Sequence, residues 1–284
     1  MLRKALFISL GLVFLVSTAA IAAKNSIQIK GSDTMVNLGQ AWAEKYMEKN
    51  PGDFIAVTGG GSGTGIAALV NSTCDIAETS RSMKGQEIAL AESKGVEPVE
   101  HIVGLDGIAV VVNLDNPVDK LTMEQLRAIF MGMIKNWKEL GGQDKKIVIL
   151  SREVNSGTHV FFKEHVLRRG VEKGPEEFAP DALLMSSSQA IADEVAGNVN
   201  AVGYYGMGYI SPKQKAVLVA KDEKSDYVYP SIENVISRSY PISRPLYIYT
   251  NGEPQGLVKK FLDFVLSKEG QDIVLATDFV PINR

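Results

Sequence analysis

The segment Ile147–Thr158 reads IVILSREVNSGT and joins two kinds of structure. Its first four residues, 147–150, form an apolar, β-branched run that predicts a buried strand. The polar stretch Ser151–Thr158 follows, and an amphipathic helix is predicted beyond it, through Val166. The predicted unit is therefore a strand, a turn rich in hydroxyl groups with one glycine, and then a helix.

The same unit recurs along the chain. The alternating strand Ile27–Lys30 leads into Gly31–Thr34 and a helix, and Phe54–Val57 leads into the glycine-rich loop Gly59–Gly65 and another helix. Further strands are predicted at 108–112, 201–205, 216–219 and 246–249, and a late helix at 257–265. Alternating strands and helices predict an α/β fold with mainly parallel sheets.

The first 23 residues have the three parts of a secretory signal peptide. Arg3 and Lys4 are followed by the apolar run 5–16, and then by small residues that include an Ala20-Ile21-Ala22 cleavage pattern. A membrane anchor is the weaker alternative, because a spanning helix needs about 20 apolar residues. The sequence thus predicts export as a soluble periplasmic protein with a cleavable signal peptide at 1–23.

Net charge and cysteine content limit the functions that this chain is expected to have. The formal net charge is −3 at pH 7, which argues against non-specific nucleic-acid binding because that depends on basic patches. The single cysteine, Cys74, excludes a disulfide within the chain, and its apolar neighbours predict a buried, inert thiol. Trp42 and Trp137 are predicted core residues.

Three segments place hydroxyl residues and glycine between a strand and a helix: 31–34, 59–65 and 151–158. The first turn of a helix leaves backbone N–H groups unpaired at the positive end of the helix dipole. Glycine lets a ligand approach this backbone, and hydroxyls add donors, so the combination suits an oxyanion. Helix capping alone is the simpler alternative for each segment. In the third segment, 151–158, Arg152 adds a guanidinium that can donate two hydrogen bonds to an anion. The alternative is that Arg152 only pairs with a surface acid such as Glu153.

Other chemistries find little support. A Walker loop needs lysine where Ile66 stands, and the dinucleotide pattern fails because Thr64 occupies the place of its last glycine. His159 and His165 are spaced so that they do not share a helix face, and no histidine–carboxylate cluster has metal-ligand spacing. The sequence predicts no catalytic residue, no metal and no cofactor.

The chain resembles the phosphate-binding subunits of bacterial ABC phosphate importers over nearly its whole mature length. The matching stretches are 31–34 (GSDT), 58–65 (TGGGSGTG), 75–81 (DIAETSR), 106–113 (DGIAVVVN), 121–130 (LTMEQLRAIF), 136–138 (NWK), 151–158, 201–206 (AVGYYG) and 243–252 (SRPLYIYTNG). The resemblance implies a two-lobed, type II periplasmic-binding fold of the α/β class, with the ligand cleft between the lobes. Lobe one is expected to comprise 24–114 and 238–284, and lobe two 115–237, with chain crossings near Asn113–Pro117 and Ile236–Pro241.

The resemblance also implies a set of phosphate-binding residues. Thr34 and the N–H of Met35 match a first contact at a helix start, and Ser62 matches the serine of the glycine-rich loop. Arg152, Ser156, Gly157 and Thr158 match the family's arginine and its Ser-Gly-Thr, with the same four-residue spacing. The implied set is Thr34, Met35, Ser62, Ser80, Arg81, Arg152, Ser156, Gly157 and Thr158.

Ser80 departs from the family pattern. Some members carry an aspartate there, which accepts a hydrogen bond from protonated phosphate and rejects sulfate, because sulfate would leave a buried charge unpaired. Ser80 discriminates less strongly between phosphate and sulfate, because a hydroxyl can donate to either anion as well as accept from phosphate. Asp33 is the candidate replacement acceptor for the P–OH group, with a helix N-cap as its alternative role. Glu78 and Asp106 are lesser candidates.

The function implied is high-affinity binding of inorganic phosphate in the periplasm and its delivery to the membrane permease of an ABC importer, without catalysis. A monomer is expected. Two alternatives stay open: a binder of another tetrahedral oxyanion such as sulfate, molybdate or arsenate, and a phosphate sensor. A secreted phosphatase would need a metal cluster or an activated nucleophile, and the sequence offers neither.

Overall fold

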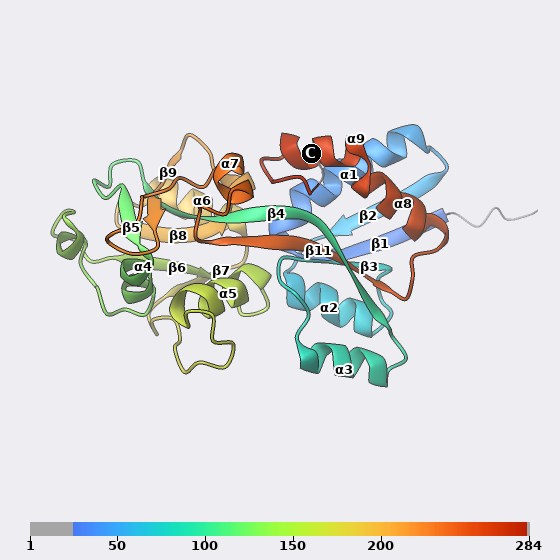
Figure 1. Cartoon of the computed structure of the whole chain (residues 1–284), viewed down its shortest axis with the longest axis horizontal. Helices are drawn as coiled ribbons and strands as arrows, with labels where there is room; N and C mark the ends of the chain where they lie inside the picture. The colour runs from blue at the N-terminus through green and yellow to red at the C-terminus, as the bar shows by residue number, and fades with distance from the viewer. Residues whose placement is uncertain (1–24, 283–284) are drawn as a thin grey trace, which may run out of the picture.

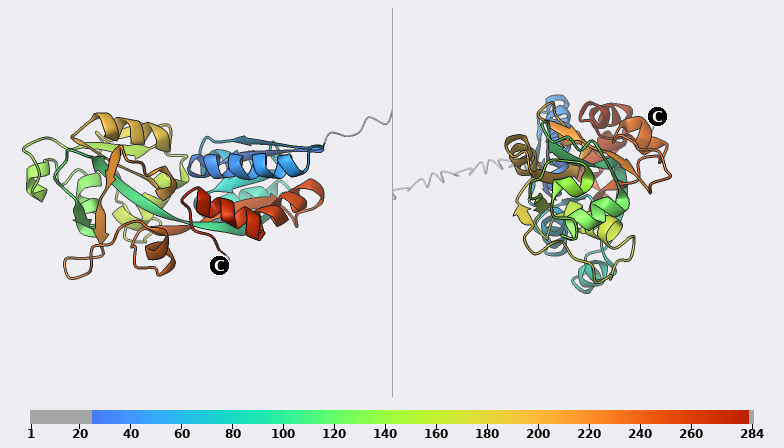
Figure 2. Two further views of the ribbon diagram at one scale, coloured as in Figure 1. Left: turned by 90° about the horizontal axis from the view of Figure 1, so that it is seen from above. Right: turned by 90° about the vertical axis from the view of Figure 1, so that its left-hand side faces the viewer.

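A computed structural model describes residues 25–282, so the predicted signal peptide lies outside the described residues. Two α/β bodies lie end to end, and two long strands run between them (Figure 1). Seen from above, each body has its own helices beside its own strands (Figure 2). The connecting strands are β4 (Pro98–Asn113) and β11 (Ser243–Asn251). Between residues 25 and 282, no helix is both long and apolar enough to cross a membrane.

The first lobe is a five-stranded arrangement covered by helices on both faces. In order across the sheet its strands are β2 (Asp53–Thr58), β1 (Asn25–Gly31), β3 (Ile76–Thr79), β11 and the first part of β4. One face carries α1 (Val36–Lys49), α8 (Gly256–Leu266) and α9 (Lys268–Ala276), and the other carries α2 (Ser62–Val70) and α3 (Gly85–Ser93). Each face therefore buries its own apolar cluster.

The second lobe continues the same sheet. From β4 the order is β8 (Ala201–Gly206), β6 (Val148–Arg152) and β7 (Leu183–Met185), and β9 (Gln214–Ala216) pairs with β4. A two-stranded sheet joins β5 (Lys120–Thr122) to β10 (Leu218–Ala220). The helices are α4 (Met123–Phe130), α5 (Gly157–Phe162), α6 (Ser188–Gly197) and α7 (Ile232–Ile236), and α5 continues as a π-helix, Lys163–Leu167.

Strand β4 changes partners along its length. From Pro98 to Gly107 it pairs with β11, and from Ile108 to Val112 it pairs with β8. The partner of β4 thus changes at Gly107–Ile108, and the first chain crossing was expected farther along, near Asn113–Pro117. The chain returns at β11, which begins just after the second expected crossing near 236–241.

The sheet is mixed, whereas the sequence pattern predicted mainly parallel strands. β1, β2 and β3 are parallel, but β11 is antiparallel to β3 and β4, and β4 is antiparallel to β8. The reason is topological: β4 leads out to the second lobe and β11 leads back, so the two run in opposite directions. The predicted strand 216–219 is also two strands, because β9 pairs with β4 while β10 turns to β5.

The predicted core residues are buried. The indole N–H of Trp42 donates to Gly270 O at 2.8 Å, and that of Trp137 donates to Asn200 O at 2.9 Å. Burial raises the pKa of the Cys74 thiol to about 11, so this thiol stays protonated and unreactive at neutral pH.

Candidate functional site

Hydroxyl groups from both lobes meet in one buried polar cluster. Thr34 precedes α1 in the first lobe and Thr158 lies in the first turn of α5 in the second, and their Oγ1 atoms lie 2.7 Å apart. Ser62, the first residue of α2, accepts from the backbone N–H of Ser80 at 3.0 Å, and their hydroxyls lie 3.3 Å apart. The structure thus brings four of the predicted ligands together, three of them at helix starts, where unpaired N–H groups favour an anion.

Gly157 allows the two lobes to approach this closely. A Cβ atom at this position would lie 2.2 Å from Ser62 Oγ and 2.6 Å from Ser80 Oγ, so any larger residue would displace these two hydroxyls. The preceding residue, Ser156, is the N-cap of α5, and its Oγ accepts from the N–H of His159 at 3.4 Å. The first turn of α5 therefore points its backbone at the serines of the first lobe.

Arg152 and Asp33 form an ion pair between the lobes. Arg152 is 1% exposed, and its Nη1 lies 3.0 Å from Asp33 Oδ2. The same Oδ2 accepts from the N–H of Ser188 at 2.8 Å and from the Ser188 hydroxyl at 2.9 Å. Asp33 thus binds the first turn of α6 in the other lobe, a contact different from the local N-cap considered above. Within residues 25–282, Asp33 Oδ1 accepts no hydrogen bond.

A second buried arginine, Arg244 at the start of β11, lies in the same cluster. It donates from Nε at 3.1 Å and from Nη2 at 2.9 Å to Asp106 Oδ2, and from Nη1 to Ser80 O at 2.8 Å. Its Nη2 also reaches Thr158 Oγ1 at 2.9 Å and Thr34 Oγ1 at 3.4 Å. Our sequence analysis did not single out Arg244. The available signal was an arginine and an aspartate, each lying just ahead of an apolar run of the sequence.

Arg81 and Glu78 are placed differently from the cluster. Both Nη atoms of Arg81 donate at 2.7 Å to the carboxylate of Glu87, at the start of α3. This predicted ligand therefore uses the two nitrogens of its guanidinium end for an ion pair outside the cluster. Glu78 is 1% exposed and lies against Gly39 of α1, and burial raises its pKa to about 8.

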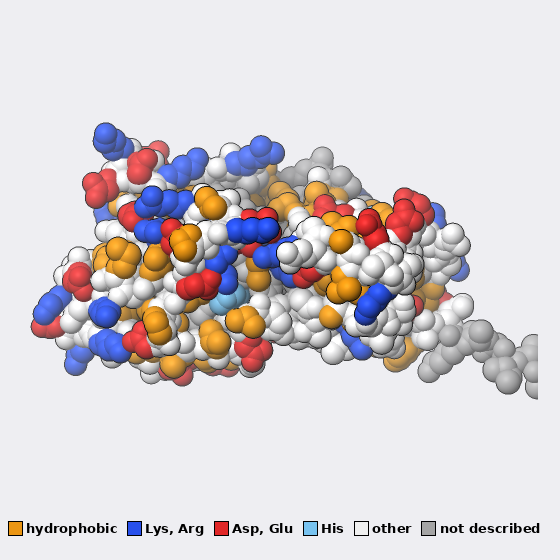
Figure 3. Space-filling view, turned by 90° about the horizontal axis from the view of Figure 1, so that it is seen from below, with side chains coloured by type: hydrophobic (Ala, Val, Ile, Leu, Met, Phe, Trp, Pro, Cys, Tyr) orange, Lys and Arg blue, Asp and Glu red, His pale blue; other side chains and the backbone are white. Residues whose placement is uncertain are grey.

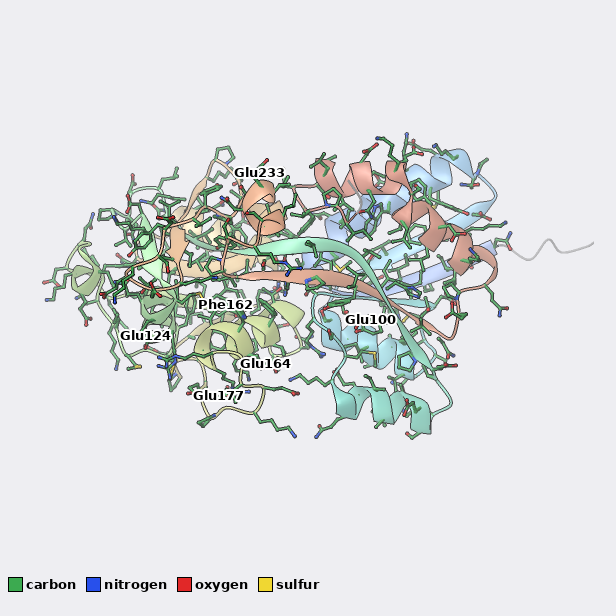
Figure 4. All side chains as sticks on the ribbon, in the orientation of Figure 1. Glu100, Glu124, Phe162, Glu164, Glu177 and Glu233 are labelled. Atoms are coloured by element: carbon green, nitrogen blue, oxygen red, sulfur yellow. The ribbon has the colours of Figure 1, made fainter. Side chains whose placement is uncertain are left out.

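Aromatic packing fixes the helix that carries Ser156–Thr158. Phe162, labelled in Figure 4, stacks on Tyr204 with ring centroids 3.9 Å apart. The Tyr204 hydroxyl lies 2.8 Å from Ser151 Oγ. His159 Nδ1 lies 3.2 Å from the same Oγ, and burial lowers the pKa of His159 to about 4. His159 is therefore neutral near pH 7 and serves packing rather than acid–base chemistry. Across the described part of the chain, no group of three or more His, Cys, Asp or Glu is placed to hold a metal ion.

Further contacts join the lobes around the cluster. Asn155 Nδ2 donates to Gly60 O at 2.8 Å and to Thr64 Oγ1 at 3.1 Å, and Asn155 O accepts from Gly63 N at 2.9 Å. Glu164, labelled in Figure 4, pairs with Lys84 across the junction at 2.7 Å. Figure 3 shows basic and acidic side chains gathered at this junction. The structure therefore describes a closed arrangement of the lobes.

Asn155→Ala removes both side-chain bonds across the junction and leaves the helix starts intact. Each such bond contributes roughly 0.5–1.5 kcal/mol, so we expect ligand affinity to fall about tenfold and the lobes to open more readily. Calorimetric titration of the ligand and small-angle scattering measure the two effects. Asn71→Ala is the matched control, because Asn71 Nδ2 bonds to Ala67 O within the first lobe. Equal affinities for the two variants would contradict the expectation.

The fold and this inter-lobe cluster define a class of protein: two-lobed binding proteins that close around a ligand. The model of the PBP superfamily domain matches residues 18–269, and the chain belongs to this family. Its architecture is the type II periplasmic-binding fold.

Named relatives make the comparison more specific. The phosphate-binding protein PstS of Pseudomonas aeruginosa is 34% identical over 269 residues, covering 89% of this chain and 81% of that protein. PstS of Bacillus subtilis is 34% identical over 264 residues, covering 92% and 82%. A substrate-binding protein of Clostridium perfringens, crystallised with bound phosphate, superimposes with a TM-score of 0.81 at 35% identity, covering 91% of this chain and 100% of that one.

Proposed function

We propose that this protein binds inorganic phosphate with high affinity in the periplasm and delivers it to the permease of an ABC importer. One observation carries the proposal: residues of the two lobes meet in a buried cluster, Thr34 with Thr158, Ser62 with Gly157, and Asp33 with Arg152. Such a cluster supplies neutral and charged donors on several sides of a small anion. The phosphate-binding relatives named above support the same ligand.

The proposed ligands are the helix-start residues and the arginine between the lobes. The hydroxyls form two pairs, Thr34 with Thr158 and Ser62 with Ser80, so a bound anion would replace the bond within each pair. The complete proposed set is Thr34, Met35, Ser62, Ser80, Arg152, Ser156, Gly157 and Thr158. We propose a supporting role for Arg81, because its ion pair with Glu87 orders the loop that follows Ser80.

Recognition of the phosphate proton is the second part of the proposal. Asp33 uses Oδ2 for Ser188 and Arg152 and keeps Oδ1 without a described partner, so Oδ1 is the proposed acceptor for P–OH. Sulfate has no such proton near neutral pH and would face this carboxylate unpaired. The acceptor would therefore favour phosphate although Ser80 replaces the family's aspartate.

The proposed activity is binding without catalysis. The segment 1–23 would direct export and be cleaved, and the closed lobes of a monomer would present phosphate to the permease. Closure would exclude water from the cluster and strengthen each charged contact.

Calorimetric titration of residues 24–284 with phosphate tests the function. We expect saturable binding of one phosphate per chain at micromolar affinity or tighter, and much weaker binding of sulfate. Absence of heat with phosphate at millimolar concentration would refute the proposal. Equal or tighter binding of sulfate, molybdate or arsenate would instead establish that the ligand is another tetrahedral anion. The specific observation behind this alternative is Ser80, whose hydroxyl rejects an unprotonated anion less strongly than an aspartate would. Phosphate uptake by cells that lack the protein distinguishes transport from sensing, because only a transport role predicts slower uptake.

A further inference from the structure

Arg244 occupies the point where the two lobes and the connecting strand converge. Its Nη2 lies 3.4 Å from Thr34 Oγ1 in the first lobe and 2.9 Å from Thr158 Oγ1 in the second. These two oxygens are 2.7 Å apart. A ligand oxygen that accepts from both hydroxyls would therefore lie next to the Arg244 guanidinium.

The guanidinium also has donor capacity left for a ligand. Of its five N–H groups, the Nε–H and one on Nη2 serve Asp106, and one on Nη1 serves Ser80 O. The second hydrogen on Nη2 is shared by two hydroxyls that are themselves proposed ligands, Thr34 and Thr158. The second hydrogen on Nη1 has no acceptor among residues 25–282.

The surroundings hold this arginine in place. Its side chain is 1% exposed, and Asp106 is fully buried beside it. Asp106 uses both oxygens, because Oδ1 accepts from the N–H of Met207 at 3.1 Å while Oδ2 accepts from Arg244. The ring of Phe161, on α5, lies 5.5 Å from the guanidinium carbon. Asp106 therefore has no free oxygen for a ligand and acts through Arg244.

We propose that Arg244 is a second arginine of the oxyanion site, which donates directly to the bound anion, and that Asp106 is its positioning residue. This inference rests on the proposed function. It gives the site two arginines, Arg152 and Arg244, each tied to its own carboxylate. Because Arg244 stands on the strand that connects the lobes and reaches hydroxyls of both, it also favours the closed form over the open one.

The test compares phosphate titrations of the wild type with Arg244→Gln, Arg244→Lys, Asp106→Asn and the double variant Arg244→Gln/Asp106→Asn. The single glutamine variant leaves Asp106 buried without its cation and is at risk of misfolding. The double variant removes both charges and keeps the fold testable, as thermal unfolding without phosphate will verify. We expect the double variant to bind phosphate at least about 100-fold more weakly. Arg244→Lys should recover part of the loss, because it restores the charge without the fork.

The role of Asp106 has its own readout. If Asp106 only positions Arg244, Asp106→Asn should lower affinity about tenfold in the wild type and have no further effect beside Arg244→Gln. Arg238→Gln, an exposed arginine near the same strand, controls for general electrostatics and should leave affinity unchanged. A folded double variant within about threefold of the wild-type affinity would overturn the role of Arg244. A wild type that binds no oxyanion would instead refute the proposed function, so the two failures are distinguishable.

Discussion

Arg152→Ala is expected to weaken phosphate binding at least about 100-fold while the protein stays folded. Charge-assisted hydrogen bonds contribute roughly 1.5–3 kcal/mol each, and the substitution removes every one that Arg152 could give to a bound anion. The loss has a second cause. Asp33, which pairs with Arg152 Nη1 at 3.0 Å, would keep its charge in the cleft and repel the ligand.

Two further variants separate these causes. Arg152→Ala/Asp33→Asn removes the repulsion as well as the cation and keeps an amide oxygen that can accept from P–OH, so it should recover part of the affinity lost in the single variant. Arg169→Ala is the matched control, because Arg169 is an exposed arginine of the same lobe whose ion pair is with Glu124. Calorimetry gives the affinities and circular dichroism verifies the fold. A folded Arg152→Ala protein with wild-type affinity would remove Arg152 from the site.

The helix starts of this site could be predicted from sequence because their signal is local. Hydroxyl residues and glycine between an apolar strand and a periodic helix are read from neighbouring positions, and Thr34, Ser62 and Thr158 do meet in the structure. The alternation of strands and helices likewise predicted the α/β class. Elementary physical patterns are sufficient where the residues that decide a feature are adjacent in the chain.

The pairing of Arg244 with Asp106 could not be predicted this way. The two residues are 138 positions apart, and they meet only because β11 lies beside β4. The change of pairing partner at Gly107–Ile108 has the same origin, because a single continuous strand pairs first with β11 and then with β8, and both partners come from much later in the chain. The position of the Arg81 side chain is set by its ion pair with Glu87. Glu87 reaches Arg81 because it lies in the first turn of α3, which the pattern of the phosphate site does not reveal.

Glu78→Gln is expected to stabilise the protein strongly at alkaline pH. The Glu78 carboxyl is 1% exposed, its Oε1 has no hydrogen-bond partner among the described residues, and a Cβ on Gly39 would lie 2.5 Å from that atom. Burial alone raises its pKa from 4.5 to about 8. An ionised carboxylate in this position would lose its hydration without gaining a partner.

The sign of the pH dependence follows from the two pKa values. Between about pH 4.5 and about pH 8 the folded protein keeps a proton on Glu78 that the unfolded chain releases. The contribution of Glu78 to the free energy of unfolding is therefore largest below pH 4.5, decreases as pH rises, and levels off above pH 8. The slope approaches about 1.4 kcal/mol per pH unit for one proton, so the full span is on the order of several kcal/mol.

Glutamine keeps the shape of the side chain and cannot ionise, so Glu78→Gln should remove this slope. Denaturant unfolding of both proteins at about pH 5, 7 and 9 measures the effect, with the stability difference in favour of the variant growing at each step. Glu44→Gln, at an exposed position of α1, is the matched control and should leave the pH profile unchanged. Parallel profiles for the wild type and Glu78→Gln would show that Glu78 is ionised in the folded protein, and the buried site would then have to contain a partner for its charge.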